Sequence, residues 1–136
     1  MSDLEGRVIV VTGGAGGLGA AMCSTLSEAG ADVVLTDARR ELAEATAEQI
    51  DRASAHALDV TDEEQVRRFL ETVARERGRL DAVINNAGID FTLPIEELRV
   101  DQWDRVLAVN LRGPFLVSKY AFPFLKRQGS GHIVNI

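Results

Sequence analysis

The sequence contains few cysteine, proline or aromatic residues, no excess of basic charge and no long apolar run. Its single cysteine, Cys23, cannot form an internal disulfide, which favours a reducing compartment, and we expect the cytoplasm. Its 15 basic residues are outnumbered by 21 acidic ones, so no nucleic-acid partner is expected, because that binding needs Lys and Arg to neutralise phosphates. No stretch approaches the roughly 18 apolar residues of a membrane span. No membrane partner is therefore expected. The acidic start, Met1–Gly6, is also not typical of a signal peptide.

The rest of the composition is that of a globular protein. Of the 136 residues, 46% are hydrophobic and 26% are charged, with 12 Gly and 3 Pro, which excludes collagen-like, low-complexity and disordered chains. Because a domain holds roughly 150 residues, residues 1–136 are predicted to form one domain.

Five short apolar runs alternate with longer helical segments. The predicted strands are Arg7–Thr12, Ala31–Thr36, His56–Val60, Asp81–Asn85 and His132–Ile136. The predicted helices are Leu18–Ala29, Glu41–Arg52, a third that opens with a capping box at Thr61–Glu64 and closes at Gly78, and a fourth over about Val100–Gln128. Inside the fourth, Pro114 lacks a backbone donor and predicts a kink near Gly113–Pro114.

This alternation predicts an α/β fold. Parallel strands need a helical crossover between them, and right-handed crossovers place helices on both faces of the sheet. We therefore expect an open, doubly wound parallel sheet. Ligands bind such sheets beyond the carboxyl ends of the strands, near the point where the strand order reverses.

Glycines or short polar side chains follow four successive predicted strands. They are the Gly-rich segment Thr12–Gly19, then Asp37, then Asp59 and Val60, and then Asn85–Gly88. Because the carboxyl ends of parallel strands meet at one edge of a sheet, we expect these residues to face one crevice.

The Gly-rich segment is typical of an anion site. Glycines let the backbone approach a pyrophosphate, and the N-terminus of the following helix offers N–H groups and a partial positive charge. A tight turn without a ligand is the alternative interpretation. Two glycine registers fit, Gly14-x-Gly16-x-x-Gly19 and Gly13-x-x-x-Gly17-x-Gly19.

Asp37 indicates which nucleotide would bind. It lies 18 residues beyond Gly19, close to the roughly 20 at which an acidic residue meets an adenosine ribose. Its carboxylate would accept bonds from the ribose hydroxyls and repel a 2′-phosphate, which favours NAD over NADP. Arg39 and Arg40 oppose this, because a guanidinium could hold that phosphate. A helix-capping Asp before Glu41 is the alternative, but it would not explain the spacing.

Four motifs occur together along the chain. They are Thr12-Gly13-x-x-x-Gly17-Leu18-Gly19, Asp59-Val60, Asn85-Asn86-Ala87-Gly88, and Asn110 within Val109-Asn110-Leu111. In these motifs the chain resembles the short-chain dehydrogenase/reductase family over all 136 residues. The Asn-Asn-Ala-Gly motif selects the second glycine register and the branch of the family that carries it. The resemblance implies a Rossmann-like sheet of five strands in the order 3-2-1-4-5 with four helices, incomplete at the C-terminus.

The same resemblance implies roles for individual residues. The glycine motif, with Gly13, Gly17, Leu18 and Gly19, would hold the cofactor's phosphates. Asp59 would bond the adenine amino group with Val60 beside the ring, and Asn86, Ala87 and Gly88 would line the middle of the cofactor. Thr12 would join the first strand's end to the Asn-Asn-Ala-Gly segment.

Asn110 would lie at the kink of the long helix. In the family, this Asn holds a water that relays protons to a catalytic lysine. A buried side chain that satisfies the backbone freed by Pro114 is a compatible alternative.

The family's reaction is hydride transfer between a nicotinamide and the carbonyl or secondary alcohol carbon of a small-molecule substrate. It uses a serine, a tyrosine and a lysine four residues after the tyrosine. The only tyrosine, Tyr120, is followed at that distance by Phe124, and Lys126 lies about 240° around a helix from it. The sequence stops at Ile136, before the expected serine, so we expect the cofactor-binding half of an enzyme, inactive by itself. The alternatives are a non-catalytic nucleotide- or partner-binding module and an unfolded remnant.

Two further expectations concern partners. The apolar fifth strand, with Ile133, Val134 and Ile136, would form an edge without a neighbour, which favours association and a possible homo-oligomer. No group of His, Cys or acidic residues has the spacing of metal ligands, so no metal is expected.

Overall fold

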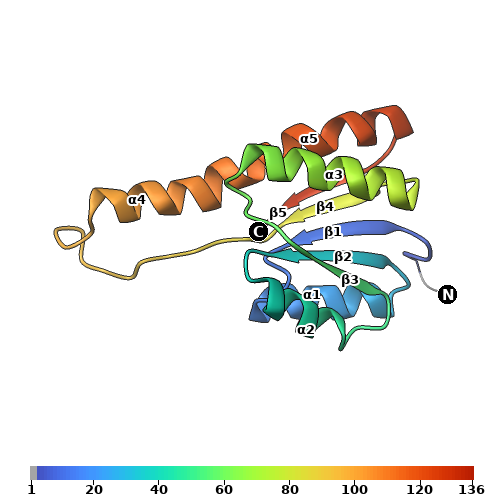
Figure 1. The fold of residues 1–136 in the computed structure, drawn as a ribbon, viewed down its shortest axis with the longest axis horizontal. Helices are drawn as coiled ribbons and strands as arrows, with labels where there is room; N and C mark the ends of the chain where they lie inside the picture. Colours follow the sequence, from blue (N-terminus) through green and yellow to red (C-terminus); the bar gives the residue numbers. More distant parts are fainter. Residues whose placement is uncertain (1–2) are drawn as a thin grey trace.

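The computed structural model describes residues 3–136 and contains one parallel sheet of five strands (Figure 1). The strands lie in the order β3-β2-β1-β4-β5, as the resemblance implied, and their order reverses between β1 and β4. Their bounds are Val8–Thr12 for β1, Asp32–Asp37 for β2, Ala53–Ala57 for β3, Ala82–Asn85 for β4 and His132–Asn135 for β5.

Helices cover both faces of this sheet, which confirms the doubly wound fold. Figure 1 shows α1 and α2 on one face and α3 and α5 on the other. Their bounds are Gly17–Glu28 for α1, Arg40–Ala47 for α2, Glu63–Arg77 for α3, Val100–Leu107 for α4 and Gly113–Gln128 for α5. A π-helical turn, Ala108–Arg112, joins α4 directly to α5, so these three pieces form the fourth predicted helical segment.

The core consists of two layers, one on each side of the sheet. Successive residues of β1 point to opposite faces, as a strand requires: Val10 packs into the layer under α3 and α5, and Val11 into the layer under α1 and α2. All five β1 residues are buried. The central strand therefore lies wholly within the core, and the Gly-rich turn begins at its carboxyl end.

The third strand and the second helix differ from their predicted bounds. The predicted strand His56–Val60 is wrong by three residues at each end, since β3 pairs with β2 from Val33–Ala53 to Asp37–Ala57. The strand is alanine-rich and half-buried, so its pairing with β2 defines it rather than its own apolar pattern. The helix predicted to reach Arg52 ends at Ala47, because the chain must turn over the next five residues to enter β3.

The capping box of α3 also differs from the prediction. Asp62, and not Thr61, is the N-cap residue: its carboxylate accepts a bond from the backbone N–H of Gln65 at 3.0 Å. The side chain of Thr61 instead donates to Asp59. The helix ends, as expected, at Gly78 with a left-handed backbone.

The expected kink near Gly113–Pro114 is replaced by the π-helical turn that precedes these residues. Pro114 lies in the first turn of α5, where its missing N–H needs no helical partner. The N–H of Gly113 donates five residues back, to Ala108. Gly113 is buried, and a Cβ there would lie 2.8 Å from Val60 Cγ2, so the absence of a side chain lets α5 approach Val60.

The helix α4 lies apart from the sheet. Figure 1 shows α4 and the extended segment before it reaching beyond the carboxyl ends of the strands. Within residues 3–136, no α4 side chain is buried, and its exposed apolar residues include Val100, Trp103 and Leu107. No helix in this part of the chain is both long and apolar enough to cross a bilayer.

Candidate nucleotide-binding site

A cavity of about 410 Å³ lies where the predicted strand ends meet. Its lining residues are Gly13, Asp37, Ala38, Arg39, Leu58, Asp59, Val60, Ala87, Gly88, Ile89, Arg105 and Val109. Six of the predicted site residues are among them: Gly13, Asp37, Asp59, Val60, Ala87 and Gly88. The tertiary structure therefore gathers residues from all four strand ends around one space.

The remaining predicted residues lie elsewhere. Asn86 and Asn110 line a neighbouring cavity of about 450 Å³, which shares Ala87 and Gly88 with the first. Gly17–Gly19 line neither cavity and form the first turn of α1.

The first turn after β1 is closely packed against the segment after β4. Gly13 has a positive φ of 61°, and a Cβ there would lie 2.8 Å from the Cα of Ala87. At Gly19, a Cβ would collide with the carbonyl oxygen of Gly13. At Gly17, by contrast, it would meet nothing within 4 Å. Gly14 is also needed, against Leu35, so packing alone does not choose between the two glycine registers.

The N-terminus of α1 presents backbone donors at this edge of the sheet. Its N-cap residue is Gly16, and no side chain caps the helix. The carbonyl of Gly16 accepts its first helical bond from Ala20 at 2.7 Å, so the preceding N–H groups of the first turn have no acceptor within the helix. An uncapped N-terminus with these donors suits an anionic group such as a phosphate.

Thr12 joins the two segments in the expected way. Its buried Oγ1 accepts bonds from the backbone N–H groups of Asn86 and Ala87, each at 3.1 Å. The Asn86 amide donates in return to the carbonyl oxygens of Thr12 and Gly13, at 3.1 and 3.0 Å. These four bonds hold the segment after β4 against the Gly-rich turn.

Asp37, at the end of β2, is buried and accepts hydrogen bonds from Arg39, two residues along the chain. Arg39 donates to it from Nε at 2.9 Å, from Nη2 at 3.3 Å and from its backbone N–H at 3.1 Å. Burial of the carboxylate tends to raise its pKa, but these bonds and the charge of Arg39 outweigh burial and hold the pKa of Asp37 below its usual value. Asp37 is therefore a carboxylate. Its bonds go to Arg39, the N-cap residue of α2, and not to the N–H groups of the helix's first turn, so Asp37 is not the capping residue of α2.

Asp59 lies in the loop between β3 and α3. Its Oδ1 accepts from the backbone N–H and the hydroxyl of Thr61, at 2.9 and 2.7 Å. This short loop directs Asp59 and Val60 into the cavity even though β3 has already ended.

Asn110 holds the segment after β4 from the opposite side. Its Oδ1 accepts from the backbone N–H of Ile89 at 2.9 Å, and its Nδ2 donates to the carbonyl of Ile89 at 2.8 Å. It is exposed and bonds Ile89, so the expectation of a buried group serving the backbone freed by Pro114 is wrong. The π-helical turn Ala108–Arg112 accommodates the backbone before Pro114 without a bond from the Asn110 side chain.

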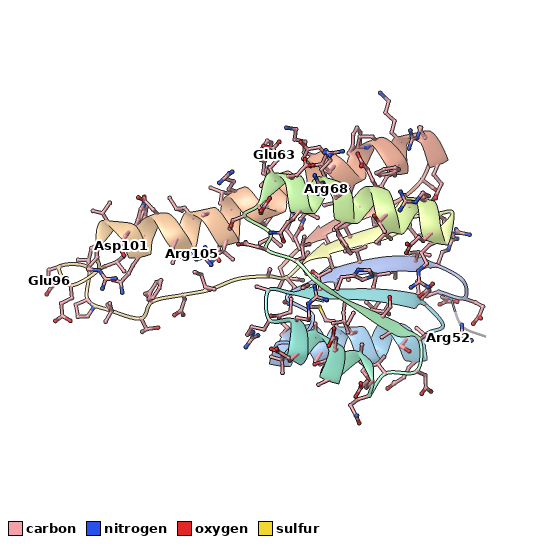
Figure 2. All side chains as sticks on the ribbon, in the orientation of Figure 1. Arg52, Glu63, Arg68, Glu96, Asp101 and Arg105 are labelled. Atoms are coloured by element: carbon pink, nitrogen blue, oxygen red, sulfur yellow. The ribbon has the colours of Figure 1, made fainter. Side chains whose placement is uncertain are left out.

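One charged residue of the cavity was not expected from the sequence. Arg105 projects from α4 on the side that faces the extended segment, and it lines the cavity together with Val109 (Figure 2). Their spacing of four places both on one helix face, which is the only local signal that could have paired them. No local sequence pattern predicts that α4 lies beyond the strand ends with this face toward the cavity.

Other reactive groups lie outside the site. Burial raises the pKa of Cys23 to about 11, so this thiol is not reactive. Tyr120, on α5, donates to Glu63 at 2.6 Å, and this bond raises the pKa of the phenol. Among residues 3–136, no three His, Cys, Asp or Glu side chains are placed to hold a metal ion.

Comparison with known proteins places the chain in a family. A sequence model of short chain dehydrogenases matches residues 7–136. D-threitol dehydrogenase of Mycolicibacterium smegmatis is 40% identical over 137 aligned positions, which cover 98% of this chain and 53% of that protein. Cyclopentanol dehydrogenase of Comamonas testosteroni is 35% identical over 140 positions, which cover 100% of this chain and 56% of that protein.

Solved structures agree with these sequence matches. The crystal structure of NAD+-bound xylitol dehydrogenase has a TM-score of 0.92 at 33% identity, over 98% of this chain and 53% of that chain. A metagenomic short-chain oxidoreductase in complex with NADP has a TM-score of 0.91 at 36% identity, over 97% of this chain and 62% of that chain. The chain spans about half the length of the curated relatives it matches. With its motifs gathered at one sheet edge and the family's model matched from residue 7 to 136, the chain belongs to the short-chain dehydrogenase/reductase family.

Proposed function

We propose that this chain binds NAD as the cofactor half of an oxidoreductase. The reaction of the whole protein is hydride transfer between the nicotinamide and the carbonyl or alcohol carbon of a small molecule. The carrying observation is the cavity into which Gly13, Asp37, Asp59 and Ala87 converge, beside the uncapped N-terminus of α1. Its donors and its buried carboxylate suit the phosphates and the ribose of a dinucleotide, respectively.

Each part of the dinucleotide has a group to meet it. The N–H groups of the first turn of α1, with Gly17, Leu18 and Gly19, hold the pyrophosphate. Asp37 accepts bonds from the adenosine ribose. Asp59 accepts one from the adenine amino group, with Val60 against the ring. Asn86–Gly88 line the middle of the cofactor.

Asn110 has a positioning part in this proposal. By bonding both backbone groups of Ile89, it fixes the segment between the two cavities, at 2.9 and 2.8 Å. In the whole protein it also holds the water that passes protons toward a lysine. The bound nicotinamide supplies the hydride chemistry, and this chain's residues bind and orient the cofactor.

NAD is proposed rather than NADP because of Asp37. A buried carboxylate at the ribose repels a 2′-phosphate, and the low pKa of Asp37 keeps its charge. Arg39 reduces this repulsion by pairing with it. Of the two neighbours described above, one holds NAD+ and the other NADP, so the choice rests on this side chain alone.

We also propose that the isolated chain has no dehydrogenase activity. It contains no tyrosine with a lysine four residues later, and its Tyr120 is bound to Glu63. The proposed setting is a cytoplasmic protein of the Asn-Asn-Ala-Gly branch, with residues 1–136 as its nucleotide-binding domain. A homo-oligomer is proposed because the α4 residues Val100 and Trp103 and the β5 residue Val134 are exposed.

Calorimetry tests the cofactor proposal. Titration of the chain with NAD is expected to show saturable binding of one equivalent, and Asp37→Ala is expected to weaken it about tenfold, the value of one charged hydrogen bond. Asp90→Ala, which removes an exposed carboxylate outside the cavity, is the matched control. Absence of NAD binding by folded chain would overturn the proposal and favour a module that binds another partner.

A further inference from the structure

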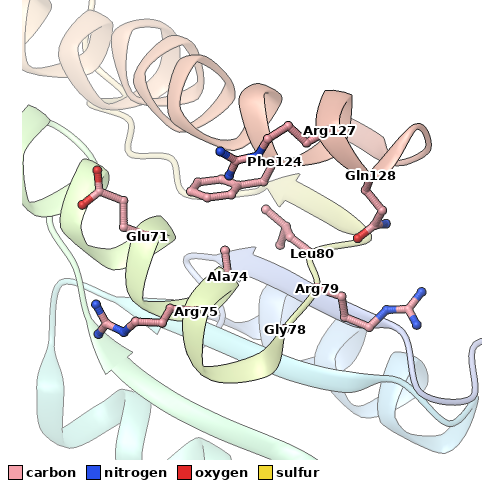
Figure 3. Close-up of a pocket in the computed structure, with 9 residues that line it drawn as sticks. All are labelled: Glu71, Ala74, Arg75, Gly78, Arg79, Leu80, Phe124, Arg127 and Gln128. Carbon is pink, nitrogen blue, oxygen red and sulfur yellow. The ribbon is translucent and has the colours of Figure 1, made fainter.

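A third cavity, of about 500 Å³, lies between the C-terminal halves of α3 and α5, and we call it the α3–α5 cleft (Figure 3). Its lining residues are Glu71, Ala74, Arg75, Gly78, Arg79, Leu80, Phe124, Arg127 and Gln128. Leu80 lies two residues before β4 begins at Ala82, so the cleft lies at the edge where the strands begin. The cavity lined by Gly13, Asp37 and Asp59 lies at the opposite edge of the sheet and shares no residue with the α3–α5 cleft.

The centre of the cleft is apolar. Figure 3 shows Ala74, Leu80 and the Phe124 ring around its middle. Leu80 is buried, and Phe124 is half-buried. An apolar or aromatic body is the kind of group that gains free energy by covering these side chains.

Arginines surround this apolar centre. Arg127 lies over the Phe124 ring at 4.9 Å from its centroid. Figure 3 shows the Arg75 head group on the α3 side of the cleft and the Arg79 head group beyond the turn at Gly78. The positive charge of the cleft is notable in a chain whose net charge is −6.

Two of these guanidinium groups are available to a ligand. Arg79 is bound to Asp81 through two bonds of 2.7 Å. Within residues 3–136, neither Arg75 nor Arg127 forms an ion pair with a carboxylate.

The one carboxylate of the cleft does not cancel this charge. Glu71 accepts two bonds from Arg67, at 2.8 and 2.9 Å, and so is already paired within α3. The cleft therefore combines an apolar centre with uncompensated positive charge at its rim. This pattern is complementary to a flat apolar ligand that carries a carboxylate.

We propose that the α3–α5 cleft binds a small aromatic carboxylate, with its ring against Leu80 and Phe124 and its carboxylate on Arg75 or Arg127. The site is separate from the proposed nucleotide function and does not depend on it. Arginines near helix C-termini also interact favourably with the helix dipole, and that role by itself would require no ligand. The experiment below distinguishes ligand binding from this role at the helix ends.

The test uses the full chain and 2-naphthoate, with neutral 2-naphthol as the comparison ligand. Calorimetry is expected to show saturable binding of one equivalent of 2-naphthoate and at least about tenfold weaker binding of 2-naphthol, because only the acid forms the charged hydrogen bond. Arg75→Gln and Arg127→Gln are each expected to weaken naphthoate binding, the one that holds the carboxylate about tenfold. In NMR spectra of the unaltered chain, the Phe124 ring signals are expected to shift on titration.

Matched controls remove the same charge from the same helices outside the cleft. They are Arg68→Gln on α3 and Lys126→Gln on α5, neither of which lines the cleft. Both are expected to bind 2-naphthoate as the unaltered chain does. Absent saturation, equal affinity for 2-naphthol, or equal losses in control and cleft variants would each overturn the proposal and leave the arginines a helix-end role only.

Discussion

Both carboxylate oxygens of Asp37 accept hydrogen bonds from Arg39, two residues along the chain, at 2.9 and 3.3 Å. The carboxylate is buried, whereas the side chain of Arg39 is 64% exposed. A ribose hydroxyl that bonds Asp37 must therefore compete with Arg39, which can swing into solvent at little cost. We therefore expect Arg39 to weaken the proposed NAD binding and to reduce the repulsion of NADP.

Replacing Arg39 should separate these two effects. Arg39→Leu is expected to strengthen NAD binding several-fold and to weaken NADP binding, because Asp37 becomes free for the ribose and its charge is no longer compensated. Calorimetry with both nucleotides measures the change. Arg40→Leu is the control, since Arg40 lies 3.7 Å from Glu44 on the exposed face of α2 and not at Asp37. Unchanged NAD affinity in Arg39→Leu would show that the pair does not compete with the ribose.

The glycines of the first turn provide a paired test of packing and binding. Gly19→Ala is expected to destabilise the chain by about 1–3 kcal/mol, because its Cβ would collide with the carbonyl of Gly13. Gly17→Ala is expected to leave the free energy of unfolding within about 0.5 kcal/mol, because its Cβ meets nothing within 4 Å. Gly17→Ala should nevertheless weaken NAD binding if the open side faces the pyrophosphate. Urea titration and calorimetry measure the two quantities, and NAD affinity unaffected by Gly17→Ala would place the pyrophosphate elsewhere.

Thr12 offers a test of the link between β1 and the segment after β4. Thr12→Val keeps the shape but leaves the N–H groups of Asn86 and Ala87 without their acceptor, so a loss of about 2 kcal/mol in unfolding free energy is expected. Thr12→Ser keeps the hydroxyl and should lose about 1 kcal/mol, the value of the missing methyl group. Equal losses in urea titrations of the two variants would mean that the hydroxyl contributes nothing.

Asp81 gives the fold a dependence on pH. Burial tends to raise its pKa, but bonds from Arg79, the backbone of Val8 and Arg7 outweigh burial and lower it strongly. A carboxyl whose pKa is lower when folded contributes stability that is fully present above its unfolded pKa of about 4 and is lost as pH falls toward the folded value.

Asp81→Asn is therefore expected to lose about 1–2 kcal/mol of unfolding free energy at pH 7 and to show a shallower decline below pH 4. Thermal unfolding across this pH range provides the measurement. Asp101→Asn is the control, because its pair with Arg99 is exposed on both sides and should contribute less than about 1 kcal/mol. Parallel pH curves for the unaltered chain and Asp81→Asn would contradict the assignment.

The edge of the sheet at β5 should control self-association. Val134 is 41% exposed on a strand that pairs only with β4 among the described residues. Val134→Lys is expected to reduce association in sedimentation experiments, because a charge on an exposed edge disfavours strand pairing. Val100→Lys on α4 tests the other apolar surface. A monomeric unaltered chain would contradict both, and an effect of Val100→Lys alone would assign association to α4.

Much of the site could be predicted because its signals are local. A β-branched run followed by glycines, as at Thr12–Gly19, specifies a buried strand and an open helix N-terminus from neighbouring residues only. Asp37 was expected at this edge from its spacing of 18 residues to Gly19, and it lines the cavity. The bounds of β3 could not, since Ala53–Ala57 becomes a strand through pairing with β2 and has little β preference of its own.

The order of strands and helices, the Gly-rich turn and the polar residues at the strand ends were thus determined by the sequence itself, because periodicity and backbone preference act over a few residues. Only the tertiary structure decided which groups those residues bond: Arg39 on Asp37, Ile89 on Asn110, and Arg105 over the cavity. The bond from Arg39 depends on side-chain direction. The other two depend on the approach of elements distant in the chain, which the packing of the whole molecule selects.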